Sequence, residues 1–348
     1  MIADVVAWVL VVVIAAYACG GGTDYGAGFW DLLAGGTERG KRPRRLIDHA
    51  MAPVWEVNNV WLIFVLVVMW TGFPTMFQAV FTALWLPLAL AVVGTVLRGA
   101  GFALRKPSRR LARRRVAGMV FAVASLVTPY FLGAVIGGIA SGRVAVGTPA
   151  SADVWSGSTS FLTGLLAIAA TAFLGAVFLS ADAHRFGAAD LVDYFRLRAV
   201  LAFCAVVVLA LVALPVTHHD APYVWHGLTR GLGVLMVALA GLCGVGTVVL
   251  LLARAPHRWS RYTSVGTVAL AVLAWGFAQR PYLLPTSLTV AQGAGAPHTM
   301  QWLGLVTLIA IVLVGPALLL VYRLDTMGRL EPLTDSDTGA AGLPGDNV

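Results

Sequence analysis

Nine long apolar runs, joined by short polar segments, constrain the fold of this chain more than any other feature of its sequence. Each run is about 17–25 residues long, the length of a helix that crosses the hydrocarbon core of a bilayer. The chain is 59% apolar and only 11% charged, whereas a soluble domain carries about 25% charged residues. The sequence therefore predicts an all-α polytopic membrane protein. The predicted spans are 2–20, 58–78, 80–98, 116–140, 158–181, 199–217, 228–253, 263–280 and 300–323.

Positive charge alternates between the segments that connect these spans. All but three of the 24 lysines and arginines follow the first, third, fifth, seventh or ninth span; the exceptions are Arg143, Arg230 and Arg280. Lysine and arginine mark cytoplasmic loops, so we expect the N-terminus outside and the C-terminus in the cytoplasm. The second and third spans are separated by very little, around residues 77–79, which predicts a tight hairpin there.

The predicted organisation is a single integral membrane domain, residues 1–330, followed by a tail, residues 331–348. The tail is rich in Asp, Gly and Pro without periodicity, which predicts a disordered cytoplasmic segment. The N-terminal run lacks a basic leader and a small-residue cleavage site, so it predicts a first span rather than a signal peptide. The net charge of +8 is explained by the cytoplasmic loops. For the basic run 105–115 we therefore expect contact with anionic lipids rather than with nucleic acid.

Histidine is absent from the middle of every predicted span. A haem buried between helices needs an axial His, Met or Cys from a span, and we expect Met69 and Met236 to serve as packing residues. We therefore expect no catalytic residue, haem ligand or metal ligand in this chain. The outer group His218, His219, Asp220 and His226 is expected to be hydrated, with a metal site as the alternative. The chain also lacks the sequence patterns of ATPases and zinc proteases.

The segment WEVNNVWL, residues 55–62, places a carboxylate, two carboxamides and two indoles at the mouth of an apolar run. An ionisable group in such a position indicates a functional site, and a carboxyl group can take up and release protons. Glu56 is thus the first candidate. Asp24 lies in a second polar segment, where glycines permit close helix packing or an unwound backbone. Asp31 is expected to cap its helix or to face water.

Six segments, in order along most of the chain, carry further motifs. They are GGTDYGAGFWDLLAGG (21–36), APVWEVNNVWLIFVLVVMWTGFPTMF (52–77), LRGAGFALR (97–105), SLVTPYFLGAVIGG (125–138), LPTSLTVAQGAGAPHTMQWL (284–303) and GPALLLVYRLDTMG (315–328). The second contains the pattern W-[DE]-x-N-x-V-W-L followed by F-P. Each motif alone is modest, but the ordered series resembles subunit II of the cytochrome bd-type quinol oxidases.

The resemblance implies a complex in the bacterial cytoplasmic membrane that oxidises quinol and reduces oxygen to water with cytoplasmic protons. Two haems b, one haem d and the quinol-oxidation loop would belong to the partner, subunit I. Subunit II would form two four-helix bundles plus a peripheral helix beside that partner. A small accessory subunit and membrane lipids are further expected partners. The quinol is ubiquinol or menaquinol, and some members hold a quinone in subunit II.

The resemblance also assigns roles to individual residues. The cytoplasmic proton route of the family passes through the carboxylate of the W-[DE] motif, which is Glu56 here; Asp24 and Asn59 are its expected companions. Trp61, with Trp55 nearby, stands where the oxygen route of the family begins. One position departs from the family pattern: Ala103 replaces the acidic residue at the cytoplasmic entrance of the proton route, so proton entry must differ.

Two other functions remain open from the residues alone. A secondary transporter would favour paired Gly- or Pro-broken helices in two corresponding halves; Pro74 and Pro129 break two early spans without a matching later pair. A purely structural scaffold would leave Glu56, Asp24 and Asn59 replaceable.

Overall fold

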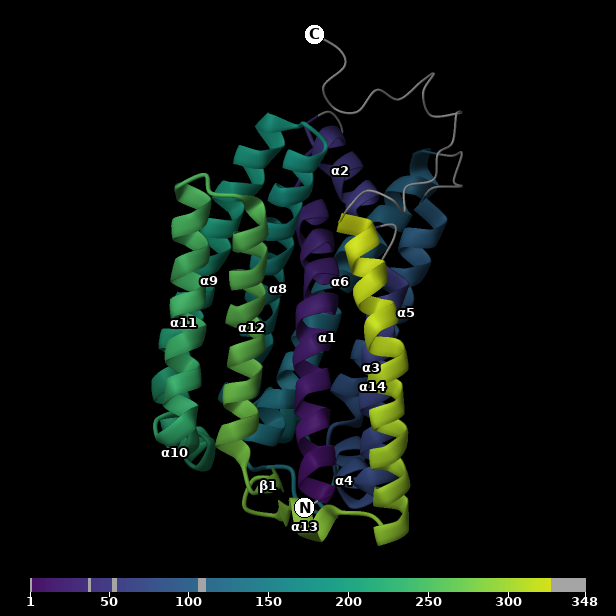
Figure 1. Cartoon of the computed structure of the whole chain (residues 1–348), viewed down its shortest axis with the longest axis vertical. Coiled ribbons are helices and arrows are strands. Elements are labelled where there is room, and N and C mark those ends of the chain that lie inside the picture. Colours follow the sequence, from purple (N-terminus) through teal and green to yellow (C-terminus); the bar gives the residue numbers. More distant parts are fainter. Residues whose placement is uncertain (1, 37–38, 52–54, 106–110, 327–348) are drawn as a thin grey trace.

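The computed structural model describes residues 2–36, 39–51, 55–105 and 111–326, and its long helices run side by side in one bundle (Figure 1). The long helices are α1 (Ile2–Leu32), α3 (Trp55–Gly72), α5 (Trp85–Arg105), α6 (Leu111–Ala140), α8 (Ser158–Arg185), α9 (Ala189–Asp220), α11 (Gly231–Leu252), α12 (His257–Gln279) and α14 (Pro297–Thr326). The short elements are α2 (Lys41–Met51), α4 (Pro74–Ala83), α7 (Ala152–Ser156), α10 (Pro222–Leu228), β1 (Tyr282–Leu284), β2 (Leu288–Thr289) and α13 (Val290–Gly293).

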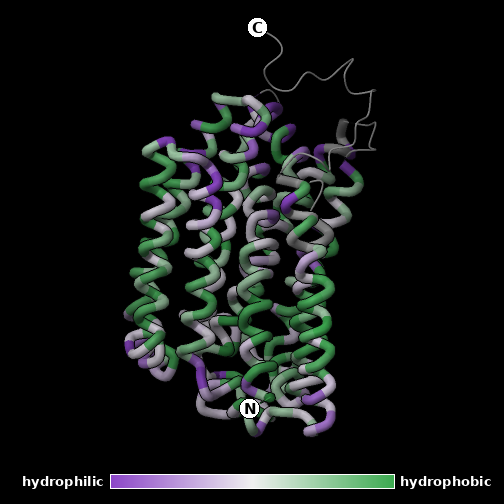
Figure 2. Tube along the Cα trace, viewed as in Figure 1, coloured by the Kyte–Doolittle hydropathy of each residue, from purple (hydrophilic) through white to green (hydrophobic). Residues whose placement is uncertain are grey.

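The prediction of an all-α polytopic membrane protein is confirmed. Within the described residues, seven helices are long and apolar enough to cross a bilayer, or eight if α3 and α4 together form one bent span. Hydrophilic residues gather toward the two ends of the bundle, and the middle is apolar (Figure 2). Helices α9, α11 and α14 expose much of their apolar surface, as expected where the surrounding solvent is lipid.

Helix α12 covers the predicted span 263–280 but is not among those seven helices. Its first half carries polar side chains, of which Ser260, Ser264 and Thr267 are buried. It packs against α1, α8, α10 and α11, so these three side chains face protein rather than lipid. The count of nine spans and the outside position of the N-terminus stay predictions, and the tail 331–348 lies outside the described residues.

The expected hairpin at residues 77–79 is wrong, because these residues lie inside α4. The chain turns instead between Gly72 and Pro74, where α3 and α4 meet at 117°. Proline has no N–H to continue the helix and favours the first helical position. Phe73 is fully buried at the corner, and the N–H of Gly295 donates to the carbonyl oxygen of Gly72 at 2.8 Å. The corner is thus packed and hydrogen-bonded.

Helix α1 occupies the centre of the bundle (Figure 1) and packs against α3, α6, α8 and α12. Its glycine-rich segment stays helical through Leu32, so the unwound alternative does not apply. Gly26 of α1 and Gly175 of α8 lie in direct backbone contact. A Cβ atom added at Gly175 would lie 2.5 Å from the carbonyl carbon of Gly26. Two glycines therefore let the backbones touch, as small residues do in membrane helix pairs.

Gly175→Ala is expected to destabilise the protein by about 1–3 kcal/mol, because α1 and α8 must move apart to admit a methyl group. The measurement is the thermal unfolding of the purified protein in detergent. Gly246→Ala in α11 is the matched control, since a Cβ there meets nothing within 4 Å. Equal thermal stability of the two variants would contradict the close α1–α8 contact.

Candidate functional site

Asp24 of α1 and Asn58 of α3 meet in the interior of the bundle. The Nδ2 group of Asn58 donates to Oδ2 of Asp24 at 2.6 Å and to the carbonyl oxygen of Gly20 at 3.1 Å. The two side chains belong to residues that are only 5% and 2% exposed. A carboxyl group without water needs hydrogen-bond donors from the protein, and α3 supplies one to α1.

A buried cation completes this group. Arg98 of α5 is 4% exposed, and its positive charge acts on Asp24. Its guanidinium carbon lies 4.8 Å from the centre of the Tyr25 ring, and the Tyr25 hydroxyl shares a 2.9 Å hydrogen bond with the hydroxyl of Tyr17. Among the described residues, Nε and Nη2 of Arg98 find no hydrogen-bond partner. We call Asp24, Asn58, Arg98 and Tyr25 the inner polar cluster.

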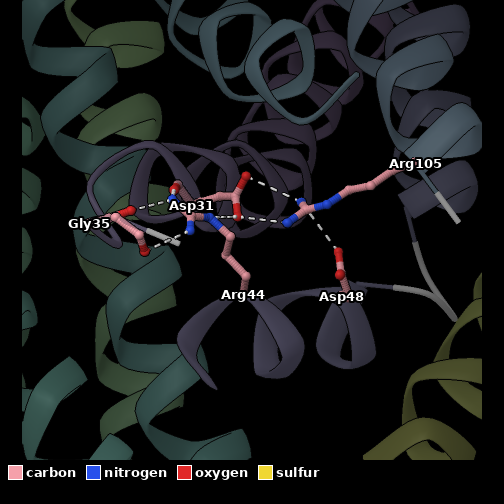
Figure 3. A network of polar contacts seen from close by, with 6 residues as sticks. Asp31, Gly35, Arg44, Asp48 and Arg105 are labelled. Carbon is pink, nitrogen blue, oxygen red and sulfur yellow. Dashed lines mark hydrogen bonds and ion pairs between the residues drawn. The ribbon is translucent and has the colours of Figure 1, made fainter. Parts of the chain in front are cut away.

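A second polar group lies two helical turns along α1. Asp31 follows Asp24 by seven residues, so both carboxyl groups project from nearly the same face, about 10 Å apart along the axis. Arg105 at the end of α5 donates two hydrogen bonds of 3.2 Å each to the carboxylate of Asp31. Figure 3 shows how Arg44 and Asp48 of α2 and the carbonyl group of Gly35 extend this network.

The network is closed by both arginines. Nη1 of Arg105 lies 3.3 Å from Oδ1 of Asp48, and Nε of Arg44 lies 3.4 Å from Oδ1 of Asp31. Arg44 also donates to the carbonyl oxygen of Gly35 at 2.7 Å. The Asp31 and Arg105 side chains are 4% and 7% exposed. We call Asp31, Arg44, Asp48 and Arg105 the α1-end ion network.

Two expectations are wrong at this end of the bundle. Asp31 does not face water, because Arg44 and Arg105 enclose its carboxylate. Arg105, the first residue of the basic run 105–115, points to Asp31 rather than to lipid. In both cases the cause is that α2 and the end of α5 place Arg44 and Arg105 beside the last turn of α1, which brings opposite charges together away from water.

The structure places the sequence-predicted residues as follows. Asp24 is in the inner polar cluster. Asn59 and Trp61 are partly buried on α3. Trp55 and Glu56 form the first turn of α3, but their side chains lie outside the described part of the structure. Ala103 is exposed on α5, two residues before Arg105.

A haem or a metal ion would need ligand side chains that converge on one place in the bundle. Met69 is buried in an apolar core with Val6, Val68 and Phe73, so it packs rather than faces a cavity. The histidines lie in the first or last turns of their helices. Nowhere in the described ranges do three His, Cys, Asp or Glu side chains gather in a way that could hold a metal ion. These residues do not fit a haem ligand set.

The fold and this site define a helical, multi-pass membrane protein with ionisable groups buried along one central helix. The family model described as cytochrome bd terminal oxidase subunit II matches residues 2–325. The chain therefore belongs to this family and is a subunit of a bacterial membrane oxidase complex.

Individual relatives agree with this assignment. The chain is 20% identical over 339 residues to a putative cytochrome bd menaquinol oxidase subunit II of Bacillus subtilis (strain 168), covering 93% of this chain and 94% of the relative. It is 26% identical over 136 residues to the cytochrome bd-I ubiquinol oxidase subunit 2 of Escherichia coli (strain K12), covering 39% of this chain and 35% of that protein. A chain in the structure of the bd oxidase from Geobacillus thermodenitrificans shares the fold, with a TM-score of 0.73, 23% identity, and coverage of 93% of this chain and 98% of that one.

Sequence reasoning did not assign a role to Arg98 or Asp48, and it assigned Arg105 to contact with lipid. One signal was present: Asp24 and Asp31 are spaced by seven residues, which puts two carboxyl groups on one helix face. Their partners come from α2, α3 and α5, and no sequence spacing links those helices to α1.

Asp31→Asn is expected to lower the stability of the purified protein by about 3–5 kcal/mol, because a buried guanidinium loses its main counter-charge. Asp190→Asn is the control, since it breaks the exposed Arg42–Asp190 pair at the same end, which is worth about 0–1 kcal/mol. The measurement is the thermal unfolding of the two purified variants. A small effect of Asp31→Asn, similar to that of the control, would mean that water reaches Arg105.

Proposed function

We propose that this chain is the haem-free subunit of a quinol:oxygen oxidoreductase and carries part of the proton route from the cytoplasm to the partner subunit. The partner holds two haems b and one haem d and contains the oxygen-reducing site. Quinol supplies the electrons; the names of the relatives include both menaquinol and ubiquinol oxidases. Residues 1–330 form the membrane domain with nine spans, as two four-helix bundles and a peripheral helix, with the N-terminus outside.

The single observation that carries the proton role is the buried Asp24–Asn58 contact between α1 and α3. A carboxyl group in the bilayer interior is costly and is retained where it serves ion or proton transfer. Asn58 directly precedes Asn59 and follows Glu56 by two residues. The start of α3 therefore brings the W-[DE]-x-N motif to the carboxyl group of α1.

The chemistry of this arrangement is proton exchange. Asp24 and Glu56 are proton acceptors and donors, and the carboxamides of Asn58 and Asn59 orient them. Arg98 supplies a fixed positive charge that offsets a carboxylate when the proton has left. Positions 56 and 59 are three residues apart and so are neighbours on one helix face. Trp55 and Trp61, on the same helix, border the oxygen route in this proposal.

The α1-end ion network has a positioning role in this proposal. Asp31 is held by two arginines, which fixes the last turn of α1 and with it the approach to Asp24. Because Ala103 provides no carboxyl group, protons reach the route through water or through a residue of the partner.

Glu56→Gln and Asp24→Asn are each expected to reduce quinol-dependent oxygen uptake by roughly 100-fold, the lower end of what a positioned proton-transfer group contributes. The haem content of the purified complex should not change, because both substitutions preserve the size of the side chain and an acceptor oxygen. Oxygen consumption per haem in purified complex measures the effect.

The matched control is Asp153→Asn, an exposed carboxylate on α7, which should leave turnover unchanged. If Glu56→Gln and Asp24→Asn also leave turnover unchanged, the subunit is a structural scaffold and the proton role is wrong. Arg98→Gln removes the positive charge but keeps the carboxyl group of Asp24. It therefore separates the effect of losing charge compensation from the effect of losing the proton carrier.

A tag on this chain is expected to copurify a subunit with the absorption bands of haems b and d. The redox centres belong to the partner in this proposal, since the described residues of this chain do not fit a haem ligand set. The measurement is a reduced-minus-oxidised spectrum of the tagged complex. Purification of the intact chain without haem, under conditions that preserve oxygen uptake in the membrane, would contradict the assignment.

A further inference from the structure

A second concentration of ionisable groups lies away from α1, where the α8–α9 turn meets the start of α12. His184 of α8 and His257 of α12 face each other with ring centres 4.6 Å apart. Arg261 of α12 is paired with Asp182 of α8, and Arg196 of α9 is paired with Asp193. We call His184, Arg196, His257 and Arg261 the histidine–arginine cluster.

Three buried nitrogen atoms of this cluster have no hydrogen-bond partner in the part of the chain that the structure describes. They are Nε of Arg196, Nε of Arg261 and Nδ1 of His257. The ion pairs with Asp193 and Asp182 use the Nη groups of the two arginines, so the acids leave the Nε groups unsatisfied. Buried donors without a partner are costly and rare in native proteins.

The local charge balance is strongly positive. Four arginines, numbers 185, 196, 254 and 261, act on only two aspartates, Asp182 and Asp193. Burial lowers the pKa of His257 below its usual 6.5, and the neighbouring His184, Arg196 and Arg261 lower it further. The two aspartates do not balance all of this positive charge, and an added anion would relieve the remaining repulsion.

The start of α12 also carries an excess of positive charge. Its first turn contains no acidic residue, and its N-cap, Pro256, makes no side-chain cap. Basic residues at a helix N-terminus oppose the helix dipole, whereas an anion there is stabilised by it. His257, Arg258 and Arg261 occupy this position. The helix end thus adds to the excess of donors in the cluster.

We propose that the histidine–arginine cluster binds a phosphate group, supplied by an anionic phospholipid or by free phosphate. A phosphate offers several strong acceptor oxygens in different directions, which suits donors that come from α9 and α12. Planar guanidinium groups pair well with phosphate. The proposed site is independent of the proton route, since it uses none of the residues of the inner polar cluster.

The surroundings favour the headgroup of a lipid. Trp259 and Tyr262 lie beside the cluster on α12, are 49% and 69% exposed, and stack edge to face at 6.2 Å. Exposed Trp and Tyr gather at the depth of lipid headgroups, and basic pockets between membrane helices bind anionic headgroups. The α8–α9 turn and the start of α12 lie at the end of the bundle opposite the N-terminus (Figure 1).

The test uses the complex purified through a tag on this chain. Arg196→Lys/Arg261→Lys keeps both positive charges for Asp193 and Asp182 but removes both Nε donors. Arg42→Lys/Arg45→Lys, two exposed positions on α2, is the matched control. After exhaustive detergent exchange, native mass spectrometry counts bound phospholipids, and equilibrium dialysis with radiolabelled inorganic phosphate measures free phosphate binding to delipidated complex.

For a lipid headgroup, the wild-type and control complexes retain a phospholipid that the Arg196→Lys/Arg261→Lys complex loses, with affinity about tenfold weaker, equivalent to about 1.4 kcal/mol. If the ligand is free phosphate, equilibrium dialysis instead shows that the Arg196→Lys/Arg261→Lys complex binds less phosphate than the wild-type and control complexes. His257→Phe, which keeps the ring contact with His184 but removes Nδ1, should weaken the same ligand if the arginine variant does not assemble. Equal phospholipid retention and equal phosphate binding in all variants would overturn the proposal.

Discussion

Ionisable side chains buried in a bilayer have to be compensated inside the protein, and the arrangement around α1 follows from that requirement. Asp24 receives a hydrogen bond from α3 and a positive charge from α5. Asp31 receives guanidinium groups from α2 and α5. Three helices are therefore tied to α1 by polar contacts. Helix α8 is tied to it differently, through the backbone contact of Gly26 with Gly175.

This combination makes α1 a rigid axis. The glycine contact fixes α1 against α8, and the α1-end ion network fixes its last turn against α2 and α5. Asp24 lies two residues before Gly26 and seven residues before Asp31, so the glycine contact fixes the turn of α1 that carries it. A group that exchanges protons benefits from such fixed surroundings, because its partners do not have to reorganise.

The two polar regions of the protein differ in kind. Around α1, donors and acceptors nearly balance: Arg105 contacts both Asp31 and Asp48, and the exception is Arg98. In the histidine–arginine cluster, donors exceed acceptors and the surface beside it is aromatic and exposed. The first arrangement suits internal charge transfer, and the second suits an external anion.

The sequence by itself determined the class of this protein. Apolar runs of bilayer length can only be helices in a membrane, because every backbone group must be hydrogen-bonded without water. It also picked out Asp24 and the WEVNNVWL segment, because polar groups are rare beside such runs. Local pattern misplaced the turn of residues 77–79, where Pro74 starts a helix after a sharp bend.

Only the tertiary structure decided which helices supply the partners of the buried groups. Arg98, Arg105 and Asp48 stand in ordinary positive or polar segments, and their roles arise from which helices neighbour α1. Asp31, which looked like an interfacial carboxylate, became buried because α2 and α5 close over it. The physical reason is that charges in a low-dielectric interior are compensated by neighbours in space. The length of an apolar run, in contrast, is a property of consecutive residues and can be read from the sequence.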